Sequence, residues 1–223
     1  MAIITILCPR LGVNPGHLLR SWLIAHFLLN WVEGGKIQHI KIGISGAAED
    51  VCLPDAFKKA EQIGYYLAKK GVVVVTGDTT GIPLSAAKGA KKAGGFTVGI
   101  SPASSYLEHV KKYKLPYKYI DFAMYTGFGY SGRNLLFIRS TDAVIFICGR
   151  IGTLNEFTIA FEDKKPIGIL TESGGISDEL DHLLVIAKRG RAKIVFDSDP
   201  EKLAAKIIKM AREDIGRIDG DSY

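Results

Sequence analysis

The sequence predicts an α/β protein with a three-layer Rossmann-like fold, in which a mostly parallel sheet has helices on both faces. Two observations lead to this prediction. From residue 37 onward, short apolar runs rich in valine and isoleucine alternate with amphipathic segments of helical period, a pattern typical of repeated strand–helix units. Several of these runs are also unbroken by polar residues, as expected for strands that helices cover on both faces.

In the first half of this region, three apolar runs each end in a turn of small or polar residues, at 45–46, 77–81 and 101–102. Pro54 suits the first turn of the helix that follows the first run, and Gly71 ends that helix. The predicted strands are residues 40–44, 72–75 and 96–100, and the predicted helices are residues 54–70 and 85–93.

The second half continues the alternation around a buried apolar run at residues 143–148. A glycine turn at 149–152 follows this run. Thr153 then stands at a helix N-cap with Glu156 three residues later, which is the pattern of a capping box. The other predicted helices are residues 104–113, 131–140, 153–163, 177–189 and 200–213, and the other predicted strands are residues 117–122, 167–170 and 193–196.

The chain is expected to contain one Rossmann-like nucleotide-binding domain, residues 36–215, between an N-terminal extension, residues 1–35, and a polar, frayed tail, residues 216–223. Within the extension, residues 22–32 are apolar on nearly every face, but a bilayer span needs about 20 residues. Three interpretations stay open: a helix added to the domain or to a partner subunit, a membrane-surface segment, or sequence foreign to the native protein. The first and third are preferred, so no membrane partner is expected.

Charge and cysteine usage narrow the partners and the compartment. The net charge is +6, but the lysines are spread over several predicted helices, which indicates a solvated face rather than a nucleic-acid site. Cys8, Cys52 and Cys148 are odd in number and lack paired spacing, so we expect no disulfide framework, no metal site and a cytoplasmic location. Cys148 is expected to be an apolar filler, with a thiol nucleophile as the less favoured alternative.

The turns at 45–46, 77–81, 101–102 and 149–153 are expected to share one crevice, because the carboxyl ends of parallel strands lie at one edge of a sheet. A helix N-terminus in that crevice offers free backbone N–H groups and a positive dipole end to a small anion. No GxGxxG follows the first strand, and Walker A, HExxH and GxSxG patterns are absent from the sequence. Hydride transfer, P-loop, metallohydrolase and serine-hydrolase chemistry therefore lack their usual motifs.

The segment Cys148 to Glu156, CGRIGTLNE, follows a buried strand, and Arg133-Asn134 lies on the helix before that strand. In this arrangement the chain resembles the LOG (Lonely Guy) family, also described as lysine decarboxylase-like, and the related molybdenum-cofactor carrier proteins. The resemblance extends from Lys41 to Lys165. Arg133 matches the upstream arginine of the family. Asn134 matches the carrier-like branch, where the hydrolase branch usually has lysine.

Two residues depart from the family pattern Pro-Gly-Gly-x-Gly-Thr-x-x-Glu and its companion turn. Arg150 replaces the second glycine and places a bulky cation where the backbone would approach a phosphate. Asp78 places a carboxylate in a turn that usually holds glycine or small residues. The two side chains have the charges to pair across the crevice and close it. With Asn134, these departures favour a carrier over a hydrolase.

For active members of the family, the resemblance implies hydrolysis of the N-glycosidic bond of a nucleoside 5'-monophosphate such as AMP, which yields free base and ribose 5-phosphate. Glu156 is the candidate to stabilise the positive charge that develops on the ribose or to activate water, and Arg133 to hold the phosphate or orient the leaving base. No cofactor is expected. The candidate phosphate- or nucleotide-binding residues are Ser45, Gly46, Gly77, Asp78, Thr80, Gly81, Asn134, Gly149, Arg150, Gly152 and Thr153.

Each role has a purely structural alternative. Glu156 could serve only in the capping box, Arg133 could serve only in an ion pair, and the glycines could serve only turn geometry. Three functions stay open: a phosphoribohydrolase, a non-catalytic carrier or sensor of a phosphorylated ligand such as a pterin cofactor or a nucleotide, and an interaction protein with a vestigial crevice. The resemblance also implies a homodimer.

Overall fold

The computed structural model of the chain describes residues 39–48, 51–190 and 193–220. The predictions for the extension at 1–35, with its apolar stretch at 22–32, lie outside the described residues and stay predictions. From His39 onward the chain forms one unit of packed elements, and this unit contains all the candidate site residues.

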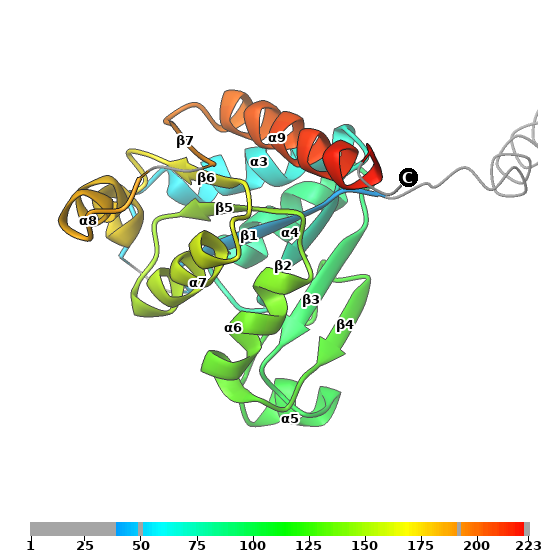
Figure 1. The fold of residues 1–223 in the computed structure, drawn as a ribbon. Helices are drawn as coiled ribbons and strands as arrows, with labels where there is room; N and C mark the ends of the chain where they lie inside the picture. The colour runs from blue at the N-terminus through cyan, green and yellow to red at the C-terminus, as the bar shows by residue number, and fades with distance from the viewer. Residues whose placement is uncertain (1–38, 49–50, 191–192, 221–223) are drawn as a thin grey trace, which may run out of the picture. The chain divides into compact units, whose positions relative to one another are not determined.

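Seven parallel strands form a single sheet in the order β4-β3-β2-β1-β5-β6-β7 (Figure 1). The strands are β1 (Lys41–Gly46), β2 (Val73–Thr76), β3 (Thr97–Ser101), β4 (Phe122–Tyr125), β5 (Ala143–Ile147), β6 (Ile167–Leu170) and β7 (Ile194–Asp197). The predicted α/β Rossmann-like fold is confirmed, and the sheet is parallel throughout its seven strands.

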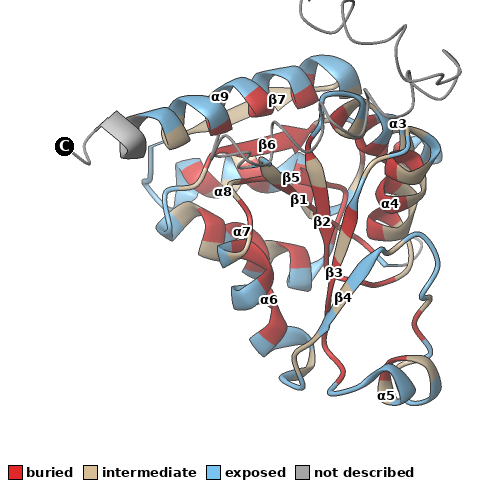
Figure 2. Cartoon of the chain, turned by 90° about the vertical axis from the view of Figure 1, so that its right-hand side faces the viewer, coloured by how far each residue is buried: buried red, intermediate tan, exposed pale blue. Residues whose placement is uncertain are grey.

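Helices cover both faces of the sheet (Figures 1 and 2). On one face lie α3 (Ala56–Lys69), α4 (Ile82–Lys92) and α9 (Pro200–Gly220), and on the other lie α6 (Gly129–Arg139), α7 (Ile151–Glu162) and α8 (Leu180–Ile186). A short helix, α5 (Tyr106–Lys111), follows β3, and the 3-10 helix η2 (Gly175–Glu179) precedes α8. Each face has its own apolar core, because the side chains of central strands such as β5 alternate between the two helix layers.

The order of the strands places the candidate site. β1 is paired with β2 on one side and with β5 on the other, so the chain proceeds outward from β1 in two directions. Ligands of open α/β sheets bind outside the carboxyl ends of the strands at such a reversal. Ser45 lies opposite Phe146 and Gly46 opposite Ile147, so β1 and β5 deliver their following turns to the same point.

Several predicted boundaries are wrong, and those of β4 and of the final helix differ most. The strand expected at 117–122 is β4, Phe122–Tyr125, because Tyr119 has a left-handed backbone (φ 68°) that interrupts an extended run. The side chain of Thr97 also holds the preceding turn, since its hydroxyl donates to the Tyr119 carbonyl at 2.6 Å. The final helix continues to Gly220 rather than ending at residue 213, so residues 216–220 of the expected frayed tail are helical.

The expectation of unpaired cysteines is also wrong. Cys52 and Cys148 form a disulfide across 96 residues, with their Cα atoms 5.4 Å apart. The sequence spacing gave no sign of this bond, because the two cysteines meet only when the loop after β1 folds beside the end of β5. Cys148 is fully buried, as expected for an apolar filler, but the bond removes the free thiol that a nucleophile needs.

No helix among the described residues is both long and apolar enough to cross a membrane.

Candidate functional site

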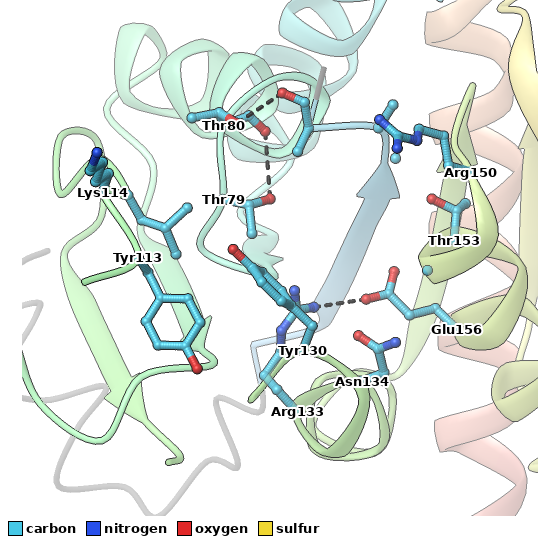
Figure 3. A pocket seen from close by; sticks show the side chains of 15 residues that line it. Thr79, Thr80, Tyr113, Lys114, Tyr130, Arg133, Asn134, Arg150, Thr153 and Glu156 are labelled. Carbon is cyan, nitrogen blue, oxygen red and sulfur yellow. Dashed lines mark hydrogen bonds and ion pairs between the residues drawn. The ribbon is translucent and has the colours of Figure 1, made fainter. Parts of the chain in front are cut away.

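A pocket of about 560 Å³ lies at the carboxyl ends of the central strands, where β1, β2 and β5 lead into their turns (Figure 3). It is lined by Gly46, Ala47, Ala48, Thr79, Thr80, Tyr113, Lys114, Leu115, Tyr130, Arg133, Asn134, Arg150, Gly152, Thr153 and Glu156. The crevice expected from the strand-end turns therefore exists, and it receives turns from three neighbouring strands.

Arg133 and Glu156 form a buried ion pair at this pocket. Nη1 of Arg133 donates to Oε1 of Glu156 at 2.7 Å, and the two residues are only 5% and 6% exposed. The hydroxyl of Ser45 donates to the other carboxylate oxygen, Oε2. We call Ser45, Arg133 and Glu156 the inner wall. Its three side chains come from β1, α6 and α7, which are far apart in the sequence.

The capping-box alternative for Glu156 is wrong. Helix α7 begins at Ile151 with Arg150 as its N-cap residue, and no side chain caps this end. The helix begins earlier than predicted because Cys148 (φ 56°) and Gly149 (φ 101°) turn the chain sharply after β5. Glu156 therefore lies more than one turn inside the helix, where it faces Arg133 and Ser45 instead of the helix end.

Gly77 and Asp78 support Arg133 from below the pocket surface. A Cβ atom at Gly77 would lie 2.3 Å from Nη1 of Arg133, so the guanidinium occupies the space that a side chain would fill. Asp78 is 4% exposed and packs against Gly99, where a Cβ atom would lie 2.6 Å from the Asp78 Cγ. Asp78 thus lies behind the pocket instead of lining it.

Burial and neighbouring charges act in opposite directions on the two buried acids. Burial raises the pKa of Asp78, while the positive charges of His109 and Arg133 lower it. His109 and Arg133 are the charged neighbours that act on this carboxyl group, and the pairing of Asp78 with Arg150 stays a prediction. Burial also raises the pKa of Glu156, and Arg133 and Ser45 oppose that rise.

The remaining predicted residues divide into lining and support. Gly46, Thr80, Asn134, Arg150, Gly152 and Thr153 line the pocket. Gly81 and Gly149 support it from outside the lining: Gly81 (φ 69°) is the N-cap residue of α4, and Gly149 lies so close to Thr153 that a Cβ atom would be 2.5 Å from the threonine side chain. The Asn134 amide donates to the Asn155 side chain at 2.8 Å, which orients it beside the inner wall.

Seven lining residues were not predicted: Ala47, Ala48, Thr79, Tyr113, Lys114, Leu115 and Tyr130. Thr79 belongs to the predicted turn at 77–81, and Ala47 and Ala48 directly follow the predicted turn at 45–46. The others come from the segment after α5 and the first turn of α6, where the periodicity is weak. The sequence position of this segment could have indicated it, because the segment follows β3 and the carboxyl end of β3 lies at the same edge of the sheet as the pocket.

No group of three or more metal-binding side chains gathers within the part of the chain that the structure describes. What the pocket offers is different: three cations, Lys114, Arg133 and Arg150, and the N-terminus of α7. These are donors suited to the oxygen atoms of an anion.

Comparisons with known proteins support the resemblance found in the sequence. A model of the SLOG cluster4 family matches residues 39–204. An uncharacterized protein of Archaeoglobus fulgidus is 33% identical over 131 residues, which cover 59% of this chain and 80% of that protein. The solved structure of the molybdenum cofactor binding protein of Rippkaea orientalis is 31% identical, with a TM-score of 0.64, and the match covers 81% of this chain and 99% of that chain.

A more distant structure shares the fold alone. DNA processing protein A of Helicobacter pylori, whose structure concerns single-stranded DNA binding, is 20% identical with a TM-score of 0.55, over 76% of this chain and 80% of that chain. The predicted resemblance to LOG-related and carrier proteins is confirmed by the family match and by the molybdenum cofactor binding protein. The match over residues 39–204 spans most of the sequence, and the chain belongs to the SLOG cluster4 family.

Proposed function

We propose that this chain binds a phosphorylated small molecule in the pocket and acts as a carrier or sensor of it. The observation that supports binding without turnover is the state of Glu156. Both of its carboxylate oxygens are engaged inside the protein, one by Arg133 and one by Ser45. A carboxylate that must activate water or stabilise a developing cation needs an oxygen directed at the substrate.

The phosphate is placed at the start of α7 in this proposal. Gly152 and Thr153 line the pocket within the first turn of that helix, whose backbone N–H groups have no partner inside the helix. The side chain of Arg150 lines the same pocket. A helix N-terminus with a nearby cationic donor is a suitable site for a phosphate group.

The rest of the ligand is proposed to be a nucleoside or a pterin. The pocket volume of about 560 Å³ lies within the ordinary range for small-molecule sites. The similar protein of Rippkaea orientalis is a molybdenum cofactor binding protein. Asn134, where the resemblance gives lysine to the hydrolase branch, also supports the carrier.

A second candidate function is the phosphoribohydrolase. The observation that favours it is the buried Arg133–Glu156 pair beside the pocket, with the pKa of Glu156 raised by burial. A carboxyl group with a raised pKa can donate a proton to a departing base, as general acids in glycoside hydrolysis do. Turnover would require the ligand to draw Arg133 away from Oε1, so that one oxygen of Glu156 reaches the ribose.

One experiment separates the two functions. The full chain is titrated with AMP, GMP, CMP and UMP by calorimetry, and the same mixtures are assayed for free base and ribose 5-phosphate by chromatography. The carrier predicts saturable binding of at least one nucleotide with no free base. Free base that disappears in Glu156→Gln would support the hydrolase, and neither binding nor product would contradict both.

Two further parts of the proposal concern assembly and location. We propose a homodimer, as the family resemblance implies, and light scattering of the purified chain measures its mass. We also retain a cytoplasmic location as a proposal, although the Cys52–Cys148 disulfide is unusual there. Thiol labelling of cell extracts without reductant determines whether the bond forms in the cell.

A further inference from the structure

The side of the pocket opposite Arg150 is formed by a different part of the chain. Tyr113 and Lys114 follow α5, and Tyr130 lies in the first turn of α6. Figure 3 shows Tyr113 and Lys114 on one side of the pocket and Arg150 and Thr153 on the other. We call Tyr113, Lys114 and Tyr130 the outer wall. The phosphate site proposed above uses none of its side chains.

The outer wall is held in place by the backbone on either side of Lys114. The N–H of Tyr113 donates to the Glu108 carbonyl at 3.0 Å, and the N–H of Leu115 donates to the His109 carbonyl at 3.1 Å. The ring of His109, 1% exposed, hydrogen-bonds the Pro116 carbonyl at 3.1 Å. Lys114 is therefore presented by an anchored turn, with a left-handed backbone of φ 53°.

Two aromatic rings accompany this cation. The rings of Tyr113 and Tyr130 meet edge to face with their centroids 5.5 Å apart. Tyr130 is 50% exposed, so part of its ring is available to a ligand. Exposed tyrosine rings offer a flat apolar surface to a planar base or pterin at little cost in conformational entropy.

Lys114 lies apart from the carboxylate of the lining. Among the described residues that line the pocket, Glu156 carries the one carboxylate, and Arg133 engages it on the inner wall, while Lys114 lies on the outer wall. A ligand with a single phosphate at the start of α7 leaves the cation of the outer wall unused. Two cationic regions separated by the width of the pocket suit a ligand with an anionic group at each end.

We propose that the outer wall is a second anion subsite, so that the ligand is an elongated phosphate ester with a planar ring near Tyr130 and a second acidic group at Lys114. This inference rests on the proposed function, since it assumes that the first phosphate lies at the start of α7. It narrows the ligand class from phosphorylated small molecules to those with two separated anionic groups, of which nucleoside bisphosphates are the simplest example.

The test compares AMP with adenosine 3',5'-bisphosphate by calorimetry on the full chain at one ionic strength. The wild-type chain is expected to bind the bisphosphate about tenfold more tightly, the gain from one charge-assisted contact. Lys114→Ala is expected to remove this gain, so that the variant binds AMP and the bisphosphate with affinities within about twofold of each other. Lys118→Ala is the matched control, because Lys118 is an exposed lysine of the same segment outside the pocket lining.

The outcomes distinguish failure of the subsite from failure of the proposed function. Equal affinities of the wild-type chain for AMP and the bisphosphate would overturn the subsite while leaving the proposed function intact. A Lys118→Ala loss as large as that of Lys114→Ala would also overturn it, since the gain would then be general electrostatic attraction. Failure of both ligands to bind would overturn the subsite together with the nucleotide form of the proposed function. Circular dichroism of each variant verifies that the fold is unchanged.

Discussion

The inner and outer walls of the pocket differ in what holds their side chains. Arg133, Glu156 and Ser45 are buried and bonded to one another, so folding fixes them before a ligand arrives. Lys114 and Tyr130 are exposed, and backbone hydrogen bonds on either side of Lys114 hold the turn that carries it. Changes to the inner wall should therefore alter stability as well as binding, whereas changes to the outer wall should alter binding alone.

The largest difference in stability between changes to the two walls is expected when the guanidinium of the inner wall is removed. Arg133→Met keeps much of the side-chain volume but leaves Glu156 buried without its cation. We expect a loss of about 3–5 kcal/mol in the free energy of unfolding, the usual cost of breaking a buried pair. Urea denaturation measures it, with Lys114→Ala as the control that should stay within about 0.5 kcal/mol of wild type.

The loss of unfolding free energy in Arg133→Met should also depend on pH. Without Arg133, burial raises the pKa of Glu156 further above its ordinary value of 4.5. A carboxyl group whose pKa is raised in the folded chain contributes its stability below the unfolded pKa and loses it as pH rises through the folded pKa. The deficit of Arg133→Met should therefore grow from about pH 4 to about pH 7. A deficit independent of pH would show that Glu156 is not the cause.

The disulfide gives the next largest effect, because it joins the loop after β1 to the residue that precedes the turn of Gly149. Cys52→Ser opens a link across 96 residues, and a loop of that length predicts a loss of about 4 kcal/mol. Denaturation with and without dithiothreitol measures it. The reductant should destabilise the wild-type chain by the same amount and leave Cys52→Ser unchanged, and a wild-type chain insensitive to reductant would contradict the prediction.

Gly77→Ala tests the inner wall with a single added carbon. The new Cβ would lie 2.3 Å from Nη1 of Arg133, so the guanidinium must move away from Gly77. We expect a loss of about 2 kcal/mol, typical of overpacking, together with weaker AMP binding. Gly190→Ala is the matched control, since nothing lies within 4 Å of its added Cβ. Unchanged AMP binding by a folded Gly77→Ala chain would show that Arg133 does not take part in binding the ligand.

The smallest effect concerns α5, which anchors the outer wall. Hydrogen bonds from Lys112 and then Ser104 lower the pKa of Glu108 to about 2. A lowered pKa contributes stability above the ordinary value of 4.5 and loses it as pH falls toward about 2. The protection factors of the Tyr113 and Leu115 amides against hydrogen exchange should therefore fall at the acid end. Glu108→Gln should abolish this change, and persistence of the change in that variant would assign it to another group.

The fold was predictable because its signals are local. The apolar runs and the glycines that end helices depend on neighbouring residues, and the central strands are recognisable because they are apolar on both faces. β4 was misplaced because it lies at the edge of the sheet. Its apolar side chains Phe122 and Met124 are exposed, so the apolar residues of this stretch do not mark a buried strand face.

The sequence predicted which residues belong to the inner wall, but it did not predict which of them bond to one another. Arg133 and Glu156 emerged from the family pattern, yet the local sequence predicted a capping box for Glu156. The structure decides otherwise, because the sharp turn at Cys148 and Gly149 begins α7 two residues before Thr153. A capping box depends on where a helix begins, and that start was set by the way β5 ends.

By itself the sequence determined the order of strands and helices along the chain, the edge of the sheet where the pocket lies, and the residues of the glycine turn. Only the tertiary structure decided three things: that Glu156 pairs with Arg133 and Ser45, that Cys52 meets Cys148, and that Lys114 lines the pocket. The physical reason is the range of the interactions. Periodicity and turn chemistry act over a few residues, whereas ion pairs, disulfides and pocket walls join segments that only the completed sheet brings together.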